Sequence, residues 1–398
     1  MHPSQGIKGM KGSQLQGKKI VLGITGSIAA VECLELAREL IRYGAEVHAV
    51  MSAEGAKIIT PYAMQFATGN DVITELDGRV QHVSLLDNTP DKADLLLIAP
   101  CTANTLSKIA CGIDDTPVTT MATIAIGSKI PVLLAPAMHA SMFENPMVRR
   151  NIVTLCESGI GFVGPRMEEK KAKIATVPDI VAAVLRYLGD WSYEGLKVLV
   201  IGGSSEEPID DMRVITNRST GETAVELAKA AYEKGAVVDL WMGRCQVQLP
   251  PMIPVCSFRT VKDLIDNIGD IDHDLVLVPA ALSDFAPKKA SGKIPSEKDG
   301  VELSLGSVPK VLPLLTKNGA KVIGFKAESG VSGSKLAAKA KAIMRSSKLA
   351  GIVANDLKNV APGRTKVIFL DSEGGEETFE GTKSSVARDI LSASRKLV

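Results

Sequence analysis

The sequence predicts an α/β protein made of two Rossmann-like domains with mainly parallel sheets. Apolar, β-rich runs alternate with helical patterns along the whole chain of 398 residues, the order that a parallel sheet with helices on both faces requires. Two series of such runs open alike, with Gly17-Lys-Lys-Ile-Val-Leu-Gly and Gly195-Leu-Lys-Val-Leu-Val-Ile. The chain is also too long for one ordinary core. These observations indicate two similar folds in tandem.

The individual runs give the expected order of elements. The first strand spans 19–25, and a helix follows from about Ile28 to Tyr43, where apolar residues recur three and four positions apart before Gly44. Further strands of this series are expected at 45–51, 94–99 and 131–135. In the second series we expect strands at 196–201, 237–242, 274–279, 321–325 and 351–354, then a hairpin of 365–370 with 376–380.

These series define the expected domains. Residues 18–190 form the predicted first domain and 191–398 the second, with a linker around 189–195. The first 17 residues are rich in Gly, Lys, Gln and Ser and contain no apolar run. We expect them to form a flexible tail that is neither a signal peptide nor a membrane anchor.

Composition narrows the classes of function. A net charge of +1 and an aromatic content of 4% argue against a nucleic-acid partner. No apolar stretch is long enough to span a membrane. The six cysteines include no Cys-x-x-Cys pair, which indicates neither a zinc site nor a disulfide framework. We therefore expect a cytoplasmic protein without a membrane partner, and the sequence identifies no metal ligands.

A candidate phosphate site follows the first strand. The segment Gly23-Ile-Thr-Gly26-Ser27-Ile-Ala-Ala lies where a strand ends and a helix begins, and the amides of a helix N-terminus attract phosphate. It is not the dinucleotide fingerprint, and the second strand ends in Met51-Ser52 without an acid for a ribose hydroxyl. The segment therefore favours a mononucleotide. A tight glycine turn that only packs a helix on a strand explains the same residues.

Two more motifs stand at strand ends, where open α/β sheets bind ligands. They are Ala99-Pro-Cys-Thr-Ala-Asn104-Thr and Ala135-Pro-Ala-Met138. Together with the glycine segment, Ser52 and His82, they resemble the flavin-containing cysteine decarboxylases, over about residues 18–188. The resemblance implies a homo-oligomer with shared FMN sites. It implies FMN contacts from Gly26, Ser27, Ser52, Pro100, Thr102, Ala103, Asn104, Ala137 and Met138.

The same resemblance implies catalytic residues. His82 stands where the family has a catalytic histidine, although a single histidine is more often structural. His139 replaces an asparagine that grips the substrate carboxylate, and Lys173 matches a family arginine. An imidazole that titrates near neutral pH suits proton handling. FMN would oxidise the thiol of the substrate and so create the electron sink that loss of CO2 requires.

One departure from the family concerns the final proton transfer. Bacterial bifunctional members carry a flap cysteine that protonates the intermediate, and this chain has Glu168-Glu-Lys-Lys-Ala-Lys173 there instead. We expect a lysine of this segment or a bound water to donate the proton. The alternative is that the lysines only hold the substrate phosphate. The candidate lysines are Lys170, Lys171 and Lys173.

The second domain carries another candidate phosphate cradle. Gly202-Gly-Ser-Ser-Glu-Glu-Pro208-Ile-Asp210 follows a strand, and Val214-Ile-Thr-Asn217-Arg-Ser-Thr-Gly221 precedes a helix. A capped helix explains the second segment equally well. The two segments resemble phosphopantothenate–cysteine ligase, and the match spans about residues 195–390. Its further motifs here are Ala280-Ala-Leu-Ser-Asp284-Phe, Lys293-Ile, Gly324-Phe325-Lys-Ala-Glu328 and Val353-Ala-Asn355-Asp356.

A ligase of this kind forms an acyl-nucleotide, which an amine then attacks, and it needs Lys or Mg2+ to neutralise the triphosphate. The resemblance implies that Asn217 holds the acyl-nucleotide, that Asp284 contacts base and ribose, and that Lys293 handles phosphate. The paired lysines of the family are displaced, because Ile343 and Ser347 stand at their positions. Further expected nucleotide contacts are Val278, Pro279, Ala280, Phe325, Lys341 and Lys348.

The two resemblances together imply an enzyme of coenzyme A biosynthesis. It would join cysteine to 4'-phosphopantothenate and decarboxylate the product to 4'-phosphopantetheine. CTP is the usual nucleotide of microbial members, and the residues do not exclude ATP. Two alternatives stay open: a decarboxylase half that stops at the enethiol, and a flavin-binding regulatory module.

Overall fold

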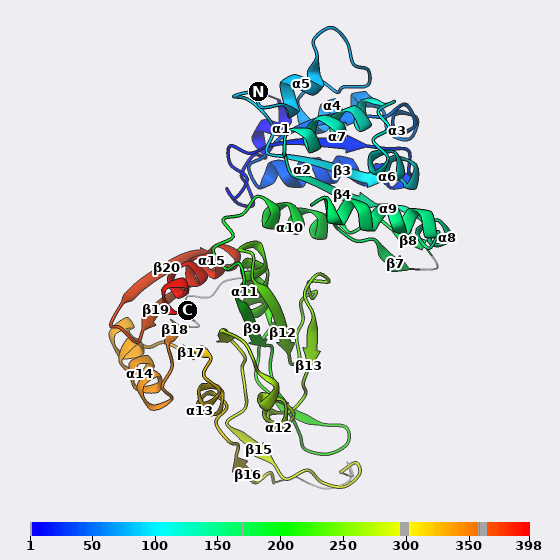
Figure 1. Ribbon diagram of the computed structural model, residues 1–398. Helices are drawn as coiled ribbons and strands as arrows, with labels where there is room; N and C mark the ends of the chain where they lie inside the picture. Colours follow the sequence, from blue (N-terminus) through cyan, green and yellow to red (C-terminus); the bar gives the residue numbers. More distant parts are fainter. Residues whose placement is uncertain (1, 169–170, 295–301, 357, 359–363) are drawn as a thin grey trace. The chain divides into compact units, whose positions relative to one another are not determined.

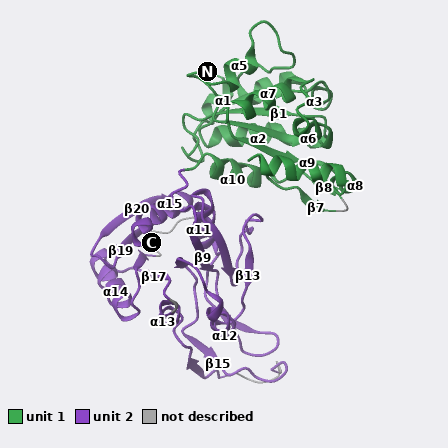
Figure 2. Ribbon diagram, in the orientation of Figure 1, with its two compact units in different colours: residues 1–189 green, residues 190–398 purple. Residues whose placement is uncertain are grey.

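The computed structural model describes residues 2–168, 171–294, 302–356, 358 and 364–398. The chain divides into two compact units, residues 1–189 and 190–398 (Figure 2). Unit 1 and unit 2 each have their own central sheet with helices on both faces (Figure 1).

Unit 1 is built on a five-stranded parallel sheet in the order β2-β1-β3-β4-β6. The strands β1, β3 and β4 are buried almost throughout, as expected for apolar runs covered on both faces. The strands are β1 (Lys19–Ile24), β2 (Glu46–Met51), β3 (Leu95–Cys101), β4 (Val132–Pro136) and β6 (Gly161–Phe162). The strands predicted for this unit are confirmed to within two residues.

Helices cover both faces of this sheet. On one face α2 (Cys33–Arg42), α4 (Pro61–Thr68) and α10 (Val177–Tyr187) contribute to the core. On the other face lie α5 (Gln81–Leu86), α6 (Ala103–Ala110), α7 (Pro117–Gly127) and α9 (Pro146–Glu157). The remaining helices are α1 (Pro3–Gly6), α3 (Ala53–Ile58) and α8 (Ala140–Phe143).

The helix predicted from Ile28 to Tyr43 has two parts. A 3-10 helix, η1 (Ile28–Glu32), precedes α2. The Ala30 amide donates to the Ser27 carbonyl (2.8 Å) and the Ser27 hydroxyl accepts from the Ala29 amide. These contacts tighten the first turn, as is common at helix N-termini.

The N-terminal segment does not form the expected flexible tail. Backbone amides of Gly9, Lys11 and Leu15 donate to carbonyl oxygens at the C-terminal end of α2. The Leu15 side chain is fully buried in the core, and the ring of His2 stands edge-on to Phe66, 5.8 Å between centroids. The prediction was wrong because one buried leucine and a few backbone hydrogen bonds hold a segment whose composition shows no apolar pattern.

A small antiparallel sheet, in the order β5-β8-β7, follows the main one. Its strands are β5 (Met138–His139), β7 (Arg166–Glu168) and β8 (Lys171–Lys173). Since β5 begins two residues after β4 ends, this sheet lies next to the carboxyl end of β4.

Unit 2 contains an eight-stranded sheet in the order β13-β12-β9-β14-β17-β18-β19-β20. The strands from β13 to β18 pair in parallel, and β19 and β20 form the predicted hairpin, antiparallel to β18. Strand bounds are β9 (Lys197–Gly202), β12 (Val237–Met242), β13 (Val255–Ser257), β14 (Leu275–Val278), β17 (Lys321–Glu328), β18 (Gly351–Asp356), β19 (Arg364–Asp371) and β20 (Glu376–Thr382).

Two layers of helices cover the sheet of unit 2. On one face lie α11 (Glu222–Glu233) and α15 (Lys383–Ser394). On the other lie α12 (Val261–Asp266), α13 (Leu312–Leu315) and α14 (Gly333–Ser346). Two short hairpins, β10 (Glu206–Pro208) with β11 (Val214–Thr216) and β15 (Phe285–Pro287) with β16 (Leu305–Ser307), and the 3-10 helices η2 (Ile268–Asp270), η3 (Thr316–Asn318) and η5 (Arg395–Leu397) complete the unit.

Candidate functional sites

The segments predicted to bind FMN gather at one edge of the unit 1 sheet. Because β1, β2, β3 and β4 are parallel, their carboxyl ends meet at the same edge. Gly26 and Ser27 follow β1, Ser52 follows β2, Thr102 follows β3, and Ala137 follows β4. The sequence analysis singled out these residues from separate motifs, and the fold brings them together.

Hydrogen bonds tie the loops of this edge to one another. The Thr25 hydroxyl donates to the Pro100 carbonyl (2.7 Å) and accepts from the Thr102 amide (3.1 Å). The Ser52 hydroxyl accepts from the Gly55 amide (3.1 Å) and caps α3. Three helix N-termini therefore begin at this edge, those of η1, α3 and α6, and their amides and dipoles favour an anionic group.

Gly26 supplies a test of whether this edge suits a bound phosphate ester. A Cβ atom at position 26 would lie 2.5 Å from the Cβ of Glu54, so the glycine allows α3 to approach the loop. This close approach keeps the starts of η1 and α3 next to each other. The residues present at this edge therefore fit the phosphate of a flavin mononucleotide.

His82 lies near the start of α5, and its Nδ1 atom is buried without a hydrogen-bond partner among the described residues. Ile73 pairs in parallel with Val50 of β2, so the chain runs toward the carboxyl edge of the sheet before α5 begins. A buried imidazole nitrogen without a partner is costly. The unpartnered Nδ1 atom is consistent with a histidine that binds a ligand.

The small sheet β5-β8-β7 presents a charged face. His139 pairs with Lys171, and Lys171 with Glu168, and directly paired residues of antiparallel strands share a face. Glu168 also accepts from Lys173 (3.3 Å) and Arg166 (2.8 Å). Lys170, a predicted proton donor, lies outside the described residues. The strands β5, β7 and β8 contain no cysteine.

Unit 2 has a cavity of about 930 Å3 at the carboxyl edge of its parallel strands, here called the main cavity. It collects six residues predicted to hold the nucleotide or the acyl-nucleotide. These are Asn217, Val278, Pro279, Ala280, Asp284 and Phe325.

Asn217 connects two of the predicted motifs. Its amide nitrogen Nδ2 donates to the carbonyl oxygens of Ala281 (3.1 Å) and Leu282 (3.0 Å). These carbonyls belong to the loop that carries Asp284. Asn217 therefore sets the position of this loop in addition to lining the cavity.

Asp210 holds a neighbouring loop in place. Its buried carboxylate accepts from the amides of Ile294 (3.0 Å), Met212 (2.8 Å) and Arg213 (2.7 Å). These backbone hydrogen bonds, that from Ile294 first, hold the pKa of the Asp210 carboxyl below its ordinary value.

Three predicted nucleotide contacts do not line the main cavity. They are Lys293, Lys341 and Lys348. Ile343 and Ser346 of α14, and Ser347 directly after it, line the main cavity. Lys341 and Lys348 line a different cavity. Lys341 lies on another face of α14, with Met344 and Arg345, and Lys348 follows the end of the helix with a left-handed backbone, φ 53°. The two positions at which the family has lysines therefore do line the main cavity, but this chain has Ile343 and Ser347 there.

Four cations that the sequence did not single out line the main cavity instead. Lys310 is paired with Asp284, Lys326 with Glu328 (3.1 Å), and Lys383 with Glu222. Two of them lie inside motifs that the sequence analysis quoted, Lys326 in 324–328 and Arg218 in 214–221. The four cations are Arg218, Lys310, Lys326 and Lys383.

Two kinds of feature are absent from the described residues. Among the described residues, no group of three or more His, Cys, Asp and Glu side chains could hold a metal ion. In the same part of the chain, no helix is long and apolar enough to cross a membrane.

Comparisons with known proteins match each of the two units to a family. Residues 9–189 match the family model of flavoproteins, and residues 193–397 match that of the C-terminal domain of DNA/pantothenate metabolism flavoproteins. The chain is 43% identical to the coenzyme A biosynthesis bifunctional protein CoaBC of Thermococcus kodakarensis, with 100% of both chains covered.

Two further relatives carry the same description. The protein of Methanocaldococcus jannaschii is 36% identical, with 100% of this chain and 98% of that one covered. The protein of Bacillus subtilis is 30% identical, with 86% and 87% covered. The chain therefore belongs to the family of bifunctional proteins of coenzyme A biosynthesis, with a flavoprotein decarboxylase half in unit 1 and a ligase half in unit 2.

Proposed function

We propose that unit 2 joins cysteine to 4'-phosphopantothenate with CTP, and that unit 1 uses FMN to decarboxylate the product to 4'-phosphopantetheine. The observation that carries the proposal is the main cavity, where Asn217, Asp284 and Phe325 meet from three separate motifs. In the first step the carboxylate attacks CTP, forms an acyl-CMP and releases pyrophosphate. The amine of cysteine then attacks the acyl carbon and CMP leaves.

The residues of the main cavity suit this step. Asn217 presents an amide side chain to the acyl-nucleotide, and Asp284 faces the base and ribose. Lys326, Lys383 and Arg218 stand in the same cavity and replace the absent family lysines as counter-charges for phosphate. Lys326 is paired with Glu328 and Lys383 with Glu222. The triphosphate would therefore compete with a glutamate for each lysine.

Mg2+ belongs to this proposal as a partner of the triphosphate. Mg2+ commonly keeps several waters and takes its other ligands from substrate phosphates and one or two carboxylates. A site of this kind does not require a cluster of protein ligands. The proposal therefore agrees with the described residues, which contain no such cluster.

In unit 1 the loops of Gly26, Ser52 and Thr102 would hold the phosphate and ring of FMN. FMN supplies the oxidation of the substrate thiol that makes loss of CO2 possible. His82, whose Nδ1 is buried and without a partner, would orient or protonate the substrate. His139 would donate a hydrogen bond to the substrate carboxylate, and Lys171 and Lys173 share its face of the small sheet.

The surface of unit 1 supports an oligomer with shared FMN sites in the cytoplasm. Large apolar side chains are exposed on η1, which follows the loop at the end of β1, and on α4. They are Ile28 (77%), Val31 (52%), Tyr62 (81%) and Phe66 (54%). Exposed apolar groups of this size mark contact surfaces. The six cysteines are free, as is usual in a reducing compartment.

The test is a reconstitution with defined substrates. Purified protein with bound FMN, Mg2+, CTP, 4'-phosphopantothenate and cysteine should release pyrophosphate and CO2 and yield 4'-phosphopantetheine by mass. ATP in place of CTP tests the choice of nucleotide. A protein that binds neither flavin nor CTP and forms no amide would refute the proposal.

A second candidate concerns only the last step. Because β7 and β8 lack the cysteine that donates a proton in bacterial relatives, the decarboxylase half could release the aminoenethiol. The same reconstitution separates the two cases, since the enethiol is two hydrogens lighter than 4'-phosphopantetheine.

A further inference from the structure

A second cavity lies at the opposite edge of the unit 2 sheet. It has a volume of about 620 Å3. Lys321 begins β17, Ala350 directly precedes β18, and Asp371 ends the antiparallel strand β19. All three line the cavity and belong to the amino edge of the parallel strands. The main cavity lies at their carboxyl edge, so the two cavities are separate.

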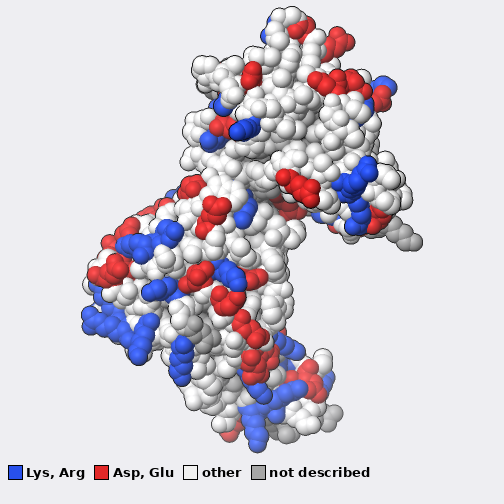
Figure 3. Space-filling model, viewed as in Figure 1, with Lys and Arg blue, Asp and Glu red and all other residues white. Residues whose placement is uncertain are grey.

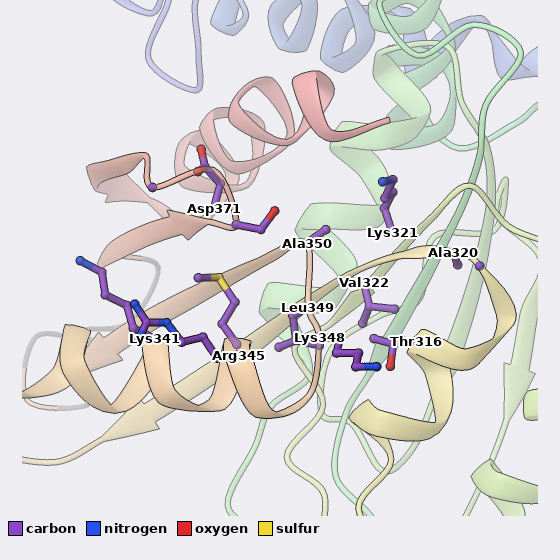
Figure 4. A pocket seen from close by; sticks show the side chains of 14 residues that line it. Thr316, Ala320, Lys321, Val322, Lys341, Arg345, Lys348, Leu349, Ala350 and Asp371 are labelled. Carbon is purple, nitrogen blue, oxygen red and sulfur yellow. The ribbon is translucent and has the colours of Figure 1, made fainter.

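The second cavity carries an excess of positive charge. Lys321, Lys341, Arg345 and Lys348 line it, and Asp371 is its one acidic residue among those described. In Figure 4 Lys341 and Arg345 extend from α14 and Lys348 from the turn after it, and Lys321 and Asp371 lie on the other side of the cavity. Figure 3 shows Lys and Arg side chains gathered over α14 on the surface.

Most of this charge is not neutralised by the residues that the structure describes. The Asp371 carboxylate is paired with Lys396 (2.7 Å) and accepts from the Gly375 amide (2.7 Å). Lys341 is paired with Glu376 (3.0 Å). The other three cations, Lys321, Arg345 and Lys348, form no ion pair with any residue that the structure describes. These three groups can therefore receive an anion without first releasing a carboxylate.

The floor of the second cavity is apolar. Val322, Met344 and Leu349 line it and are 1%, 9% and 3% exposed. A bare inorganic anion would leave this floor uncovered. An apolar floor beneath a cationic rim instead suits a molecule with an apolar portion and an anionic group, and an arginine beside lysines suits phosphate.

Helix α14 forms a wall of both cavities. Met344 and Arg345 of this helix line the second cavity, and Ile343 and Ser346 line the main one. Directly after the helix, Ser347 lines the main cavity and Lys348 the second one. A ligand that draws Arg345 and Lys348 toward its phosphate would turn or shift the same helix. Such a shift moves the main cavity's wall at the positions where the family has lysines, and so changes nucleotide binding.

We propose that the second cavity is a regulatory site for a phosphorylated small molecule with an apolar portion, which acts on the main cavity through α14. The site goes beyond the proposed function, and its binding step does not depend on ligase activity.

The binding step is tested with pyridoxal 5'-phosphate as the probe. Its aldehyde condenses with a lysine amine with loss of water, and borohydride reduces the imine to a stable amine. Labelling is done in the presence of CTP, and labelled peptides are identified by mass. Lys335, exposed on α14 and outside both cavities, is the matched control site.

We expect Lys348 to be labelled about tenfold more than Lys335. In Arg345→Gln the labelling of Lys348 should fall about tenfold, because the loss of one hydrogen bond to a charged group has an effect of about this size. Excess inorganic phosphate should also reduce the labelling of Lys348 in the wild type, because it competes with the phosphate of the probe. Equal labelling of Lys348 and Lys335 would overturn the site.

The regulatory step is tested on the labelled protein. We expect labelling to change the KM for CTP about fivefold, which is at the lower end of the range for coupled sites. In the control Arg345→Gln/Lys348→Gln, treated with the same probe and borohydride, the KM should not change. An unchanged KM with full labelling of Lys348 would overturn the coupling. A protein without pyrophosphate release would instead refute the proposed ligase and leave the labelling result valid.

Discussion

Asp284 and Lys310, from segments on either side of the β15–β16 hairpin, form an ion pair in the lining of the main cavity of unit 2. Both side chains are well exposed, at 64% and 67%. An exposed pair of this kind adds little to stability. The pair therefore matters more for what the two groups offer to a ligand than for the fold.

Asp284→Asn should raise the KM for CTP by about tenfold or more, since a hydrogen bond to a charged group contributes about 1.5–3 kcal/mol. Lys310→Gln should have a smaller effect on the KM. Neither change should shift the free energy of unfolding by more than about 1 kcal/mol. Steady-state pyrophosphate release and denaturant unfolding measure both quantities. A large loss of stability with an unchanged KM would contradict this role.

The two active halves should separate by mutation. His82→Asn should stop CO2 release and leave pyrophosphate release intact. Asn217→Ala removes the bonds to the carbonyls of Ala281 and Leu282 and should stop pyrophosphate release, while CO2 release from supplied 4'-phosphopantothenoylcysteine continues. Loss of both activities from either change, in a folded protein, would show that the sites are not independent.

Gly26→Ala should reduce FMN binding by about tenfold or more, because its Cβ would lie 2.5 Å from the Cβ of Glu54 and would displace the loop. Gly127→Ala is the matched control, since no atom lies within 4 Å of a Cβ there. The measurement is the flavin absorbance retained after dialysis against a known FMN concentration. Equal flavin content in the two variants would argue against the loop as the phosphate site.

The stability of unit 2 should depend on pH through Asp210. Backbone hydrogen bonds, that from Ile294 first, lower its pKa in the folded protein. Its contribution is therefore complete above the unfolded pKa of about 3.9, and is lost as the pH falls through the lower folded pKa. Asp210→Asn places an amide donor among backbone donors and should lower the unfolding midpoint at pH 7.

The difference in midpoint between wild type and Asp210→Asn should then narrow as the pH falls below about 4. Asp211→Asn, whose carboxylate is paired with Lys289 on the surface (2.8 Å), is the control and should unfold like the wild type. A difference that stays constant down to pH 2 would show that Asp210 acts through something other than its charge.

Replacing all six cysteines by serine should leave the final product unchanged. No cysteine lies on β5, β7 or β8, and burial raises the pKa of Cys101 to about 12, which makes that thiol a poor proton donor near neutral pH. We expect a lysine of the small sheet or a water to donate instead. Accumulation of the enethiol by the cysteine-free protein alone, measured by mass, would identify a cysteine as the donor.

The sequence predicts the strands well because buried parallel strands read as apolar runs, and the ends of those runs locate both candidate sites. It does not show which way a helix turns its side chains. Lys341 and Lys348 stand close in sequence to the expected lysine positions, yet they line another cavity. Lys310 and Lys383 reach the main cavity from segments that carry no motif. Their roles follow from tertiary packing alone.

The docked N-terminal segment has a consequence for protease resistance. Trypsin requires a chain that can open into an extended form, and chain ends are usually cut first. Lys8 and Lys11 lie in a segment that is fastened to the end of α2 by backbone hydrogen bonds and by Leu15. Cleavage after Lys8 or Lys11 requires these hydrogen bonds to break and the segment to leave α2. Trypsin should therefore cut elsewhere in the chain before it cuts at these two lysines.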